Sequence, residues 1–217
     1  MKIALIGASG FVGSAILKEA LSRQHQVTAV MRHPEKLTMQ DERLAVVPGD
    51  VMDTDQLTAL LKGNDVVISA YNAGWTNPNL YNDFLEGSQS IQKAVKSAGI
   101  KRLIVIGGAG SLYAAPEKQV VDLPGFPEAW KPGALAARDY LNLLKNEKEL
   151  DWTFVSPAVE MNPANPGKRE GRYRTGLDNP VQDEQGRSYI SVADLAVAVL
   201  DEAEQPKHIG QRFTVAY

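Results

Sequence analysis

The sequence predicts an α/β fold, with a doubly wound parallel β-sheet of about seven strands and helices on both of its faces. Short apolar runs alternate with segments whose apolar residues recur every three or four positions, which is the pattern of strands followed by helices. The strand-like runs are continuously apolar, as expected for strands that helices cover on both faces. The predicted strands are Ile3–Ile6, Val27–Met31, Leu44–Val47, Val66–Ala70, Leu103–Ile106, Trp152–Val155 and Arg212–Val215.

Capping and breaking residues mark the ends of the helices between these strands. Ser or Asp before a helix, and proline in its first turn, suit the unpaired N–H groups of that end. The predicted starts are Asp53 with Gln56 as its capping-box partner, Asn77-Pro78, Lys131-Pro132 and Ser191 with Asp194; the helix from Asn77 is predicted to end at Gly99 and the next near Lys148. No repeat or linker interrupts the pattern, so residues 1–217 are expected to form a single domain.

The run KIALIGASGFVGSAILKEAL at the start of the chain is the most informative segment. A strand, three glycines (Gly7, Gly10 and Gly13) and a helical pattern follow one another in the order of a dinucleotide-binding turn. One glycine of that motif allows the tight turn, one lets a pyrophosphate approach, and one lets the helix pack closely on the sheet. The helix N-terminus offers free N–H groups to the phosphates, and Ser9 adds a hydroxyl. We therefore predict a Rossmann fold that binds a dinucleotide; the alternative is a glycine-rich turn without a ligand.

Composition excludes several kinds of site. The chain has 217 residues and no cysteine, which excludes disulfides, thiolate nucleophiles and cysteine–zinc sites. Its net charge is −3, with no basic patch for nucleic acid or a membrane surface. The histidines lack metal-binding spacing and G-x-S-x-G is absent, so neither a metal site nor a nucleophile elbow is predicted. No apolar run approaches the ~20 residues that span a bilayer, and we expect a cytoplasmic monomer or homodimer.

The end of the second predicted strand bears on the choice of nicotinamide cofactor. An NAD-preferring site normally has an acidic residue there for the ribose 2′-hydroxyl, whereas this chain has Arg32. An arginine binds a 2′-phosphate through paired hydrogen bonds, so NADP is predicted, with NAD left open if Arg32 only stacks on the adenine. Asp50 and Val51 are expected at the adenine, and Ala70 and Tyr71 along the ribose.

Two long connections, residues 111–131 and 157–187, break the alternation of strands and helices. Connections of this length are uncommon in compact domains and are usually functional. Both follow predicted strands, so we expect them at the carboxyl edge of the sheet, where this fold binds ligands. The fifth predicted strand leads into Gly107 and Gly108, which allow close approach to the backbone, and then to Ser111, the first side chain there with a hydroxyl.

Together, KIALIGASGFVG, MRHPEK, VPGD, VISA, RLIVIGGAGS and WTFVSPA resemble the atypical short-chain dehydrogenase/reductase superfamily, over nearly the whole chain. The branch that looks most similar is that of small NAD(P)H–flavin reductase-like proteins, with biliverdin reductase B and NmrA-like proteins as relatives and epimerase/dehydratase-like proteins in the same superfamily. The resemblance implies that Ser111 lies at the family's active-site serine or threonine. It also implies a pyrophosphate site at Gly7, Ser9, Gly10, Phe11 and Val12, and a nicotinamide site at Ser156, Pro157, Ala158 and Val159. The backbone at Gly108 is expected to admit the nicotinamide or a substrate.

The family's catalytic Tyr-x-x-x-Lys is not found. Its two positions fall near Lys131 and Leu135. Tyr140 and Lys145 are five residues apart and so do not share a helix face, as a four-residue spacing would; Tyr140 is expected to pack in the core. Tyr113 is the one remaining candidate for a catalytic acid.

A missing proton donor favours some acceptors over others. A ketone needs an acid for its developing alkoxide, whereas a flavin or quinone delocalises the charge and takes its proton from water. The first hypothesis is therefore an NADPH-dependent reductase of a flavin (as substrate), a quinone or a similar acceptor, with Trp75, Phe126 and Trp130 as its stacking surface.

Two alternatives stay open. The first is a dehydrogenase or epimerase that acts on a small carbonyl or sugar through Ser111 and Tyr113. The second is an NmrA-like sensor that binds NADP without catalysis.

Overall fold

The computed structural model describes all residues 1–217 and contains an eight-stranded sheet in the order β3-β2-β1-β4-β5-β8-β10-β9. All neighbouring strands are parallel except β9, which runs antiparallel to β10. The seven predicted strands are confirmed, each end within one residue. The strands are β1 (Lys2–Ile6), β2 (Gln26–Met31), β3 (Leu44–Pro48), β4 (Val66–Ser69), β5 (Arg102–Ile106), β8 (Asp151–Ser156), β9 (Arg174–Gly176) and β10 (Gln211–Ala216).

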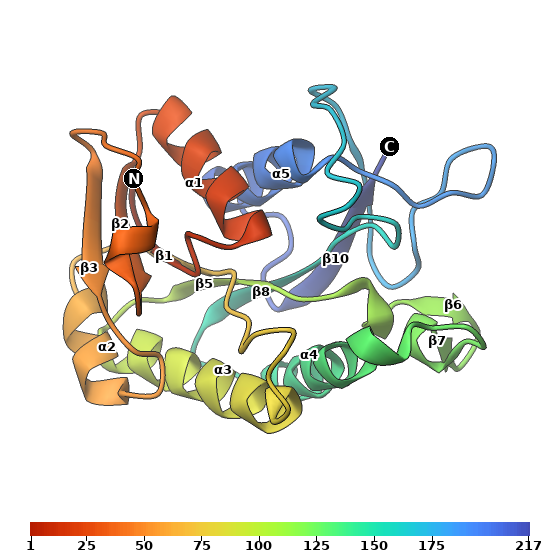
Figure 1. Cartoon of the computed structure of the whole chain (residues 1–217), viewed down its shortest axis with the longest axis horizontal. Coiled ribbons are helices and arrows are strands. Elements are labelled where there is room, and N and C mark those ends of the chain that lie inside the picture. The colour runs from red at the N-terminus through yellow and green to blue at the C-terminus, as the bar shows by residue number, and fades with distance from the viewer.

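Helices cover both faces of this sheet, as predicted (Figure 1). On one face lie α1 (Phe11–Ser22) and α5 (Val192–Glu204), and on the other α2 (Thr54–Leu61), α3 (Leu80–Ser97) and α4 (Lys131–Leu144). The strand order reverses between β1 and β4, and in open α/β sheets such a reversal places the ligand crevice at the carboxyl ends of those two strands. None of these helices is long and apolar enough to span a bilayer.

Each face of the sheet has its own apolar core. Along β1, Ile3 and Leu5 contribute to the core beneath α1 and α5, while Ala4 and Ile6 contribute to the core beneath α2, α3 and α4. Successive residues of a strand point to opposite faces, so every position of a doubly covered strand is buried. This explains why the predicted strands read as continuous apolar runs.

Two predicted helix ends are wrong. The helix expected from Asn77-Pro78 begins at Leu80, because the side chain of Asn77 accepts from the N–H of Asn79 (2.9 Å) and holds a turn instead. The helix expected to reach Lys148 ends at Leu144. Beyond that point Glu147 turns toward α3, where its carboxylate accepts from Gln92 and pairs with Lys96.

Short elements within the two long connections were not predicted. The first contains the hairpin of β6 (Tyr113–Ala115) and β7 (Lys118–Gln119) and three single-turn 3₁₀ helices, η2 (Ala109–Ser111), η3 (Val120–Asp122) and η4 (Glu128–Trp130). The second supplies β9, the eighth strand of the sheet. A further 3₁₀ turn, η1 (Pro34–Lys36), follows β2. Elements of two or three residues carry too little periodicity to be read from sequence.

Candidate functional site

The turn after β1 requires its glycines for different reasons. Gly7 has φ = +84°, and a Cβ there would lie 2.5 Å from the carbonyl oxygen of Ala70, at the end of β4. A Cβ at Gly13 would lie 2.0 Å from the carbonyl oxygen of Gly7, so Gly13 permits α1 to approach the turn. Gly10 is less crowded, with 3.3 Å to the same oxygen, and forms the N-cap of α1. Gly7 therefore makes the turn, Gly13 the close packing, and Gly10 leaves the helix end open.

The N-terminus of α1 is free to bind an anion. Its N-cap has no side chain to accept a hydrogen bond, and its first turn contains no acidic residue. The N–H groups of Phe11, Val12 and Gly13 have no hydrogen-bond partner within the protein, and the neighbouring Ser9 is exposed. Unpaired N–H groups at a helix start, on a turn where a Cβ would be obstructed, fit a pyrophosphate.

Arg32 lies at the carboxyl end of β2 with its side chain exposed and without a hydrogen bond or ion pair to another residue. His33 is instead paired with Glu35, at 3.1 Å. The positive charge of Arg32 favours a lower pKa for Tyr71, which follows β4. The predicted 2′-phosphate residue therefore lies within electrostatic range of a predicted ribose residue.

After β3, Asp50 and Val51 differ in exposure. Asp50 is exposed, and one of its carboxylate oxygens accepts from the N–H of Met52 (3.0 Å). Val51 is buried in the core beneath α2. The capping residue Asp53 accepts from the N–H of Gln56 as predicted, but the Gln56 side chain reaches back to the N–H of Asp50 and not to that of Asp53.

Tyr71 lies against α3. Its ring stacks on Phe84 with 5.9 Å between centroids, and its hydroxyl donates to the carbonyl of Asp83 (3.0 Å). Gly87 makes room for it, since a Cβ there would lie 2.6 Å from the hydroxyl oxygen. Burial raises the pKa of Tyr71 to about 12, the charge of Arg32 opposing this rise. The hydroxyl of Tyr71 is therefore held by α3 and is not positioned as an acid.

On the other side of β4, the backbone after β5 lies directly on an aromatic ring. A Cβ added at Gly107 would lie 1.9 Å from the ring of Phe154 on β8. Gly108 follows as the extended N-cap of η2. Both glycines are partly exposed, which leaves this backbone open to a ligand.

Ser111 and Tyr113, the predicted catalytic residues, have different surroundings. Ser111 is fully buried, and its hydroxyl oxygen accepts from Nη1 of Arg212 (3.1 Å). Tyr113 is half-buried, its ring centroid 5.8 Å from the guanidinium of the same arginine. The hydroxyl of Ser111 is thus closed to substrate in this structure, and the catalytic role of either residue stays a prediction.

At the end of β8 and just beyond it, the predicted nicotinamide residues are mostly buried. Ser156, Pro157 and Ala158 are buried, whereas Val159 is 40% exposed and its N–H donates to Ser188 Oγ at 3.3 Å. The hydroxyl of Ser156 has no hydrogen-bond partner although no solvent reaches it. An unpaired buried hydroxyl is unusual, and this one belongs to the segment predicted to line the nicotinamide.

The predicted stacking residues are separate in the chain but lie near the start of α4. Trp75 is 57% exposed, and a Cβ at Gly133, in the first turn of α4, would lie 2.9 Å from its ring. Trp130 is the N-cap of the same helix and is 45% exposed. Phe126 is half-buried in the connection just before it.

The first turns of α4 hold no tyrosine–lysine pair. Lys131 is paired with Glu128 (3.3 Å) at the surface. Tyr140 is 1% exposed within the core, and burial raises its pKa, so its expected packing role is confirmed. Lys145 is exposed beyond the end of the helix. The structure contains no group of three or more His, Asp or Glu side chains that could hold a metal ion.

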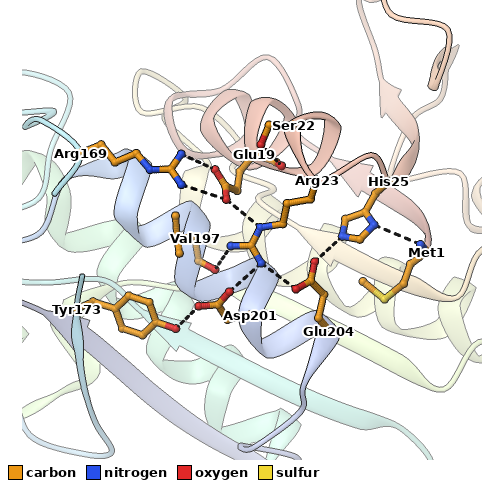
Figure 2. A network of polar contacts seen from close by, with 10 residues as sticks. All are labelled: Met1, Glu19, Ser22, Arg23, His25, Arg169, Tyr173, Val197, Asp201 and Glu204. Carbon is orange, nitrogen blue, oxygen red and sulfur yellow. Dashed lines mark hydrogen bonds and ion pairs between the residues drawn. The ribbon is translucent and has the colours of Figure 1, made fainter. Parts of the chain in front are cut away.

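The second connection is held on the helices by residues 168–173, which we call the strap (Figure 2). Arg169 pairs with Glu19 of α1 at 2.8 Å, and the hydroxyl of Tyr173 donates to Asp201 of α5. Arg23 joins these two acids from the middle of the network, at 2.8 Å from Glu19 and 2.7 Å from Asp201. This part of the connection therefore packs along α1 and α5 instead of covering the carboxyl edge.

A surface groove of about 590 Å³ lies between the β6–β7 hairpin and α4. Tyr113 is its one predicted site residue, and its other lining side chains are polar or charged: Glu117, Gln119, Arg138, Asp139 and Asn142. The groove does not include the glycine turn or Arg32, so it lies apart from the proposed dinucleotide site.

Sequence reasoning missed three residues that shape the site: Gly87, Gly133 and Arg212. The first two carry no sequence signal, because a glycine within a helix shows its use only when its neighbour is known. The third did carry one, since Arg212 is a charged residue inside the buried strand RFTVA.

The fold and the open helix end define a Rossmann-type dinucleotide-binding protein. The chain belongs to the NAD(P)H-binding family, whose model matches residues 7–206. The predicted resemblance to the atypical short-chain dehydrogenase/reductase superfamily is confirmed.

Similar proteins cover the whole chain. It is 42% identical to the uncharacterised protein YwnB of Bacillus subtilis, over 99% of this chain and 98% of that one. A crystal structure from Bacteroides thetaiotaomicron, named a "putative epimerase", is 48% identical with a TM-score of 0.91, covering 100% of this chain and 96% of its own. Another from Streptococcus pneumoniae, named a "putative NADH-flavin reductase", is 36% identical with a TM-score of 0.86, covering 100% and 99%.

Proposed function

We propose that this chain is an NADPH-dependent reductase that transfers hydride to a flavin, a quinone or a similarly delocalised acceptor. The observation that carries the proposal is the lack of a positioned acid: the first turn of α4 has neither tyrosine nor a free lysine, Tyr71 and Tyr140 are held with raised pKa values, and Ser111 is closed off by Arg212. Each of these groups is unsuited to protonate an alkoxide at neutral pH.

The chain's own residues would act by binding and orientation. Phe11, Val12 and Gly13 would donate their N–H groups to the pyrophosphate, and Arg32 would bind the 2′-phosphate. When bound, the reduced nicotinamide supplies a hydride. The acceptor would take up this hydride together with one proton from water, so no protein side chain would have to be positioned as an acid.

The flat, exposed ring of Trp75 supports an aromatic acceptor. Trp75 is 57% exposed and the edge of its ring lies beside Gly133 at the start of α4, with Trp130 as the N-cap of the same helix. Stacking between offset aromatic rings orients a flavin or quinone without any hydrogen bond. The name of the Streptococcus pneumoniae relative agrees with this acceptor class.

A carbonyl or sugar substrate is the second candidate, and the 48% identical "putative epimerase" favours it. In that case Tyr113, which is open to the groove beside α4, would be the acid. We propose the cytoplasm as the location; a relative of 42% identity from Burkholderia pseudomallei is named a "putative exported protein", and cell fractionation decides between the two. A monomer or homodimer remains our proposal for the assembly.

The test is NADPH oxidation by the purified protein with FMN, FAD, a naphthoquinone and a set of small ketones, comparing wild type, Tyr113→Phe and Tyr81→Phe. Tyr81 is the matched control because its hydroxyl bonds Asp139 beside the same groove. We expect flavin or quinone turnover that changes only a few-fold in Tyr113→Phe. A loss of roughly 10²-fold or more in that variant alone identifies a general acid and supports the carbonyl substrate. Tight NADPH binding without turnover of any acceptor identifies a sensor.

A further inference from the structure

We propose that Arg212 on β10 is a positioning residue for the acceptor: its guanidinium holds the Ser111–Tyr113 segment and the segment after β9 together beside the acceptor. This inference rests on the proposed function, because it names the residue that organises the acceptor half of the same site. The residue is 101 positions from Ser111 in sequence, so only the fold brings the two together.

The guanidinium bonds two segments at once. Nη1 donates to the carbonyl oxygen of Ser111 (2.6 Å) and to its hydroxyl (3.1 Å), while Nη2 pairs with the carboxylate of Asp178. Asp178 follows β9 in the second long connection. A planar, forked cation suits this task, since it bonds in two fixed directions where a lysine ammonium presents a single point charge.

Main-chain bonds reinforce the joint on both sides of Tyr113. Its N–H donates to the carbonyl of Asp178 (2.8 Å), and its carbonyl accepts from the side chain of Asn179 (2.8 Å). Its ring lies beside the Arg212 guanidinium, at 5.8 Å. The position of Tyr113 is thus defined by the same few residues that Arg212 anchors.

The surroundings of Arg212 differ from those of a residue selected for packing alone. Its side chain is 3% exposed, yet its Nε has no partner and its one ionic partner, Asp178, is 62% exposed. Burying a cation is unfavourable unless it is well compensated, and replacing it by an apolar side chain of similar size is often neutral or stabilising. We therefore attribute the charge to function and not to stability.

The unpaired polar atoms next to Arg212 extend toward the predicted nicotinamide residues. Thr214 lies two positions along β10, on the same sheet face, and is the register partner of Ser156 on β8. The hydroxyls of both are buried without a partner, as is Arg212 Nε. Buried polar groups without a partner are rare in protein cores, and here three lie next to one another on one face of the sheet. They extend from Arg212, which bonds Ser111, to Ser156 at the end of β8.

The experiment compares Arg212→Met, Arg212→Lys and the control Arg102→Met. Arg102 is also a buried arginine of the sheet with an unpaired Nε. It is the first residue of β5, at the amino edge of the sheet, and it pairs there with Glu202 of α5. For each variant we would measure the Kd for NADPH, kcat and KM for FMN and for a naphthoquinone, and the rate of tryptic cleavage after Lys118 under native conditions. Lys118 is exposed in the hairpin that Arg212 helps to hold.

For Arg212→Met we expect kcat/KM for the acceptor to fall by about tenfold or more, through KM above all, with the Kd for NADPH changed less than about twofold. Cleavage after Lys118 should accelerate about tenfold relative to Arg102→Met, because the hairpin opens locally. Arg212→Lys should recover part of the acceptor kcat/KM and part of the resistance to cleavage. A lysine keeps the positive charge but cannot bond Ser111 and Asp178 at the same time.

The inference is overturned if Arg212→Met and Arg102→Met are cleaved at equal rates, or if both lose kcat/KM for the acceptor equally. Arg212 would then be merely structural. A loss of NADPH affinity confined to Arg212→Met also overturns it. If wild type reduces no flavin or quinone, the proposed function fails, and the cleavage comparison still decides whether Arg212 positions the hairpin.

Discussion

The indole of Trp75, in the loop after β4, lies across Gly133 in the first turn of α4, where a Cβ would approach the ring to 2.9 Å. Leu80, at the start of α3, lies on the same side of Gly133, at 3.3 Å from the added atom. The ring is therefore seated between two helix starts, with more than half of its surface left to solvent.

Gly133→Ala should displace this ring and raise the acceptor KM several-fold. Alanine favours the helix over glycine by up to about 1 kcal/mol, so unfolding experiments should show little loss of stability. The measurement is acceptor kinetics together with tryptophan fluorescence. In a double-mutant cycle with Trp75→Ala, the second substitution should add almost nothing to the first. Additive effects would mean that Gly133 does not act through Trp75.

Arg32→Glu should weaken NADPH binding by ~2–4 kcal/mol and leave NADH binding little changed, because a charged hydrogen-bonded pair is lost and a repulsion is added. Isothermal titration with both nucleotides measures the difference. Lys36→Glu, a charge reversal at another exposed residue, in η1, is the control. Equal losses for NADPH and NADH would show that Arg32 does not bind the 2′-phosphate.

Gly13→Ala and Gly10→Ala should differ sharply in stability. The first places a Cβ 2.0 Å from a backbone oxygen, and the second leaves 3.3 Å to the same atom. We expect Gly13→Ala to cost about 2–4 kcal/mol of unfolding free energy, because backbone has to move, and Gly10→Ala less than about 1 kcal/mol. Denaturant titration measures both. Similar costs would mean that α1 can shift away from the turn.

Glu147→Gln should change how stability depends on pH. Burial alone would raise the pKa of Glu147, but hydrogen bonds from the Glu149 N–H, the Gln92 amide and the Lys96 ammonium outweigh it and lower the pKa from its ordinary 4.5 to about 2. A carboxylate with a lowered folded-state pKa stabilises the protein above its unfolded pKa, and this stabilisation is lost as pH falls from about 4.5 toward 2.

At neutral pH the substitution should therefore lower the free energy of unfolding by up to about 3 kcal/mol. The difference in unfolding free energy between variant and wild type should narrow as pH falls below about 4.5. Urea unfolding over pH 3–7 measures it, and Glu149→Gln is the exposed control. A gap independent of pH would place the effect in packing and not in charge.

Backbone-determined features could be predicted from the sequence, while those that depend on tertiary contacts could not. The seven strands and the glycine turn follow from local apolar runs and from residues whose conformation is intrinsic. The start of α3 and the end of α4 could not be predicted, because Asn77 and Glu147 bond to neighbours that compete with the helix. The strand β9 exists only because β10 offers it an edge to pair with.

The candidate site divides in the same way. The glycine turn could be predicted, since an added Cβ at Gly7 or Gly13 would meet backbone atoms of the turn itself or of the neighbouring strand. The acceptor end was not, because the environment of Ser111 is set by Arg212 from the far end of the chain. Side chains brought together over 101 positions leave no local pattern to read.

The strap has a consequence for how such proteins diversify. Its anchors, Glu19, Asp194 and Asp201, belong to helices that also form the scaffold of the nucleotide half. Length changes on either side of the strap are therefore absorbed locally and reshape one rim of the molecule. We expect insertions and deletions there to leave the N-terminus of α1, and with it nucleotide binding, unchanged.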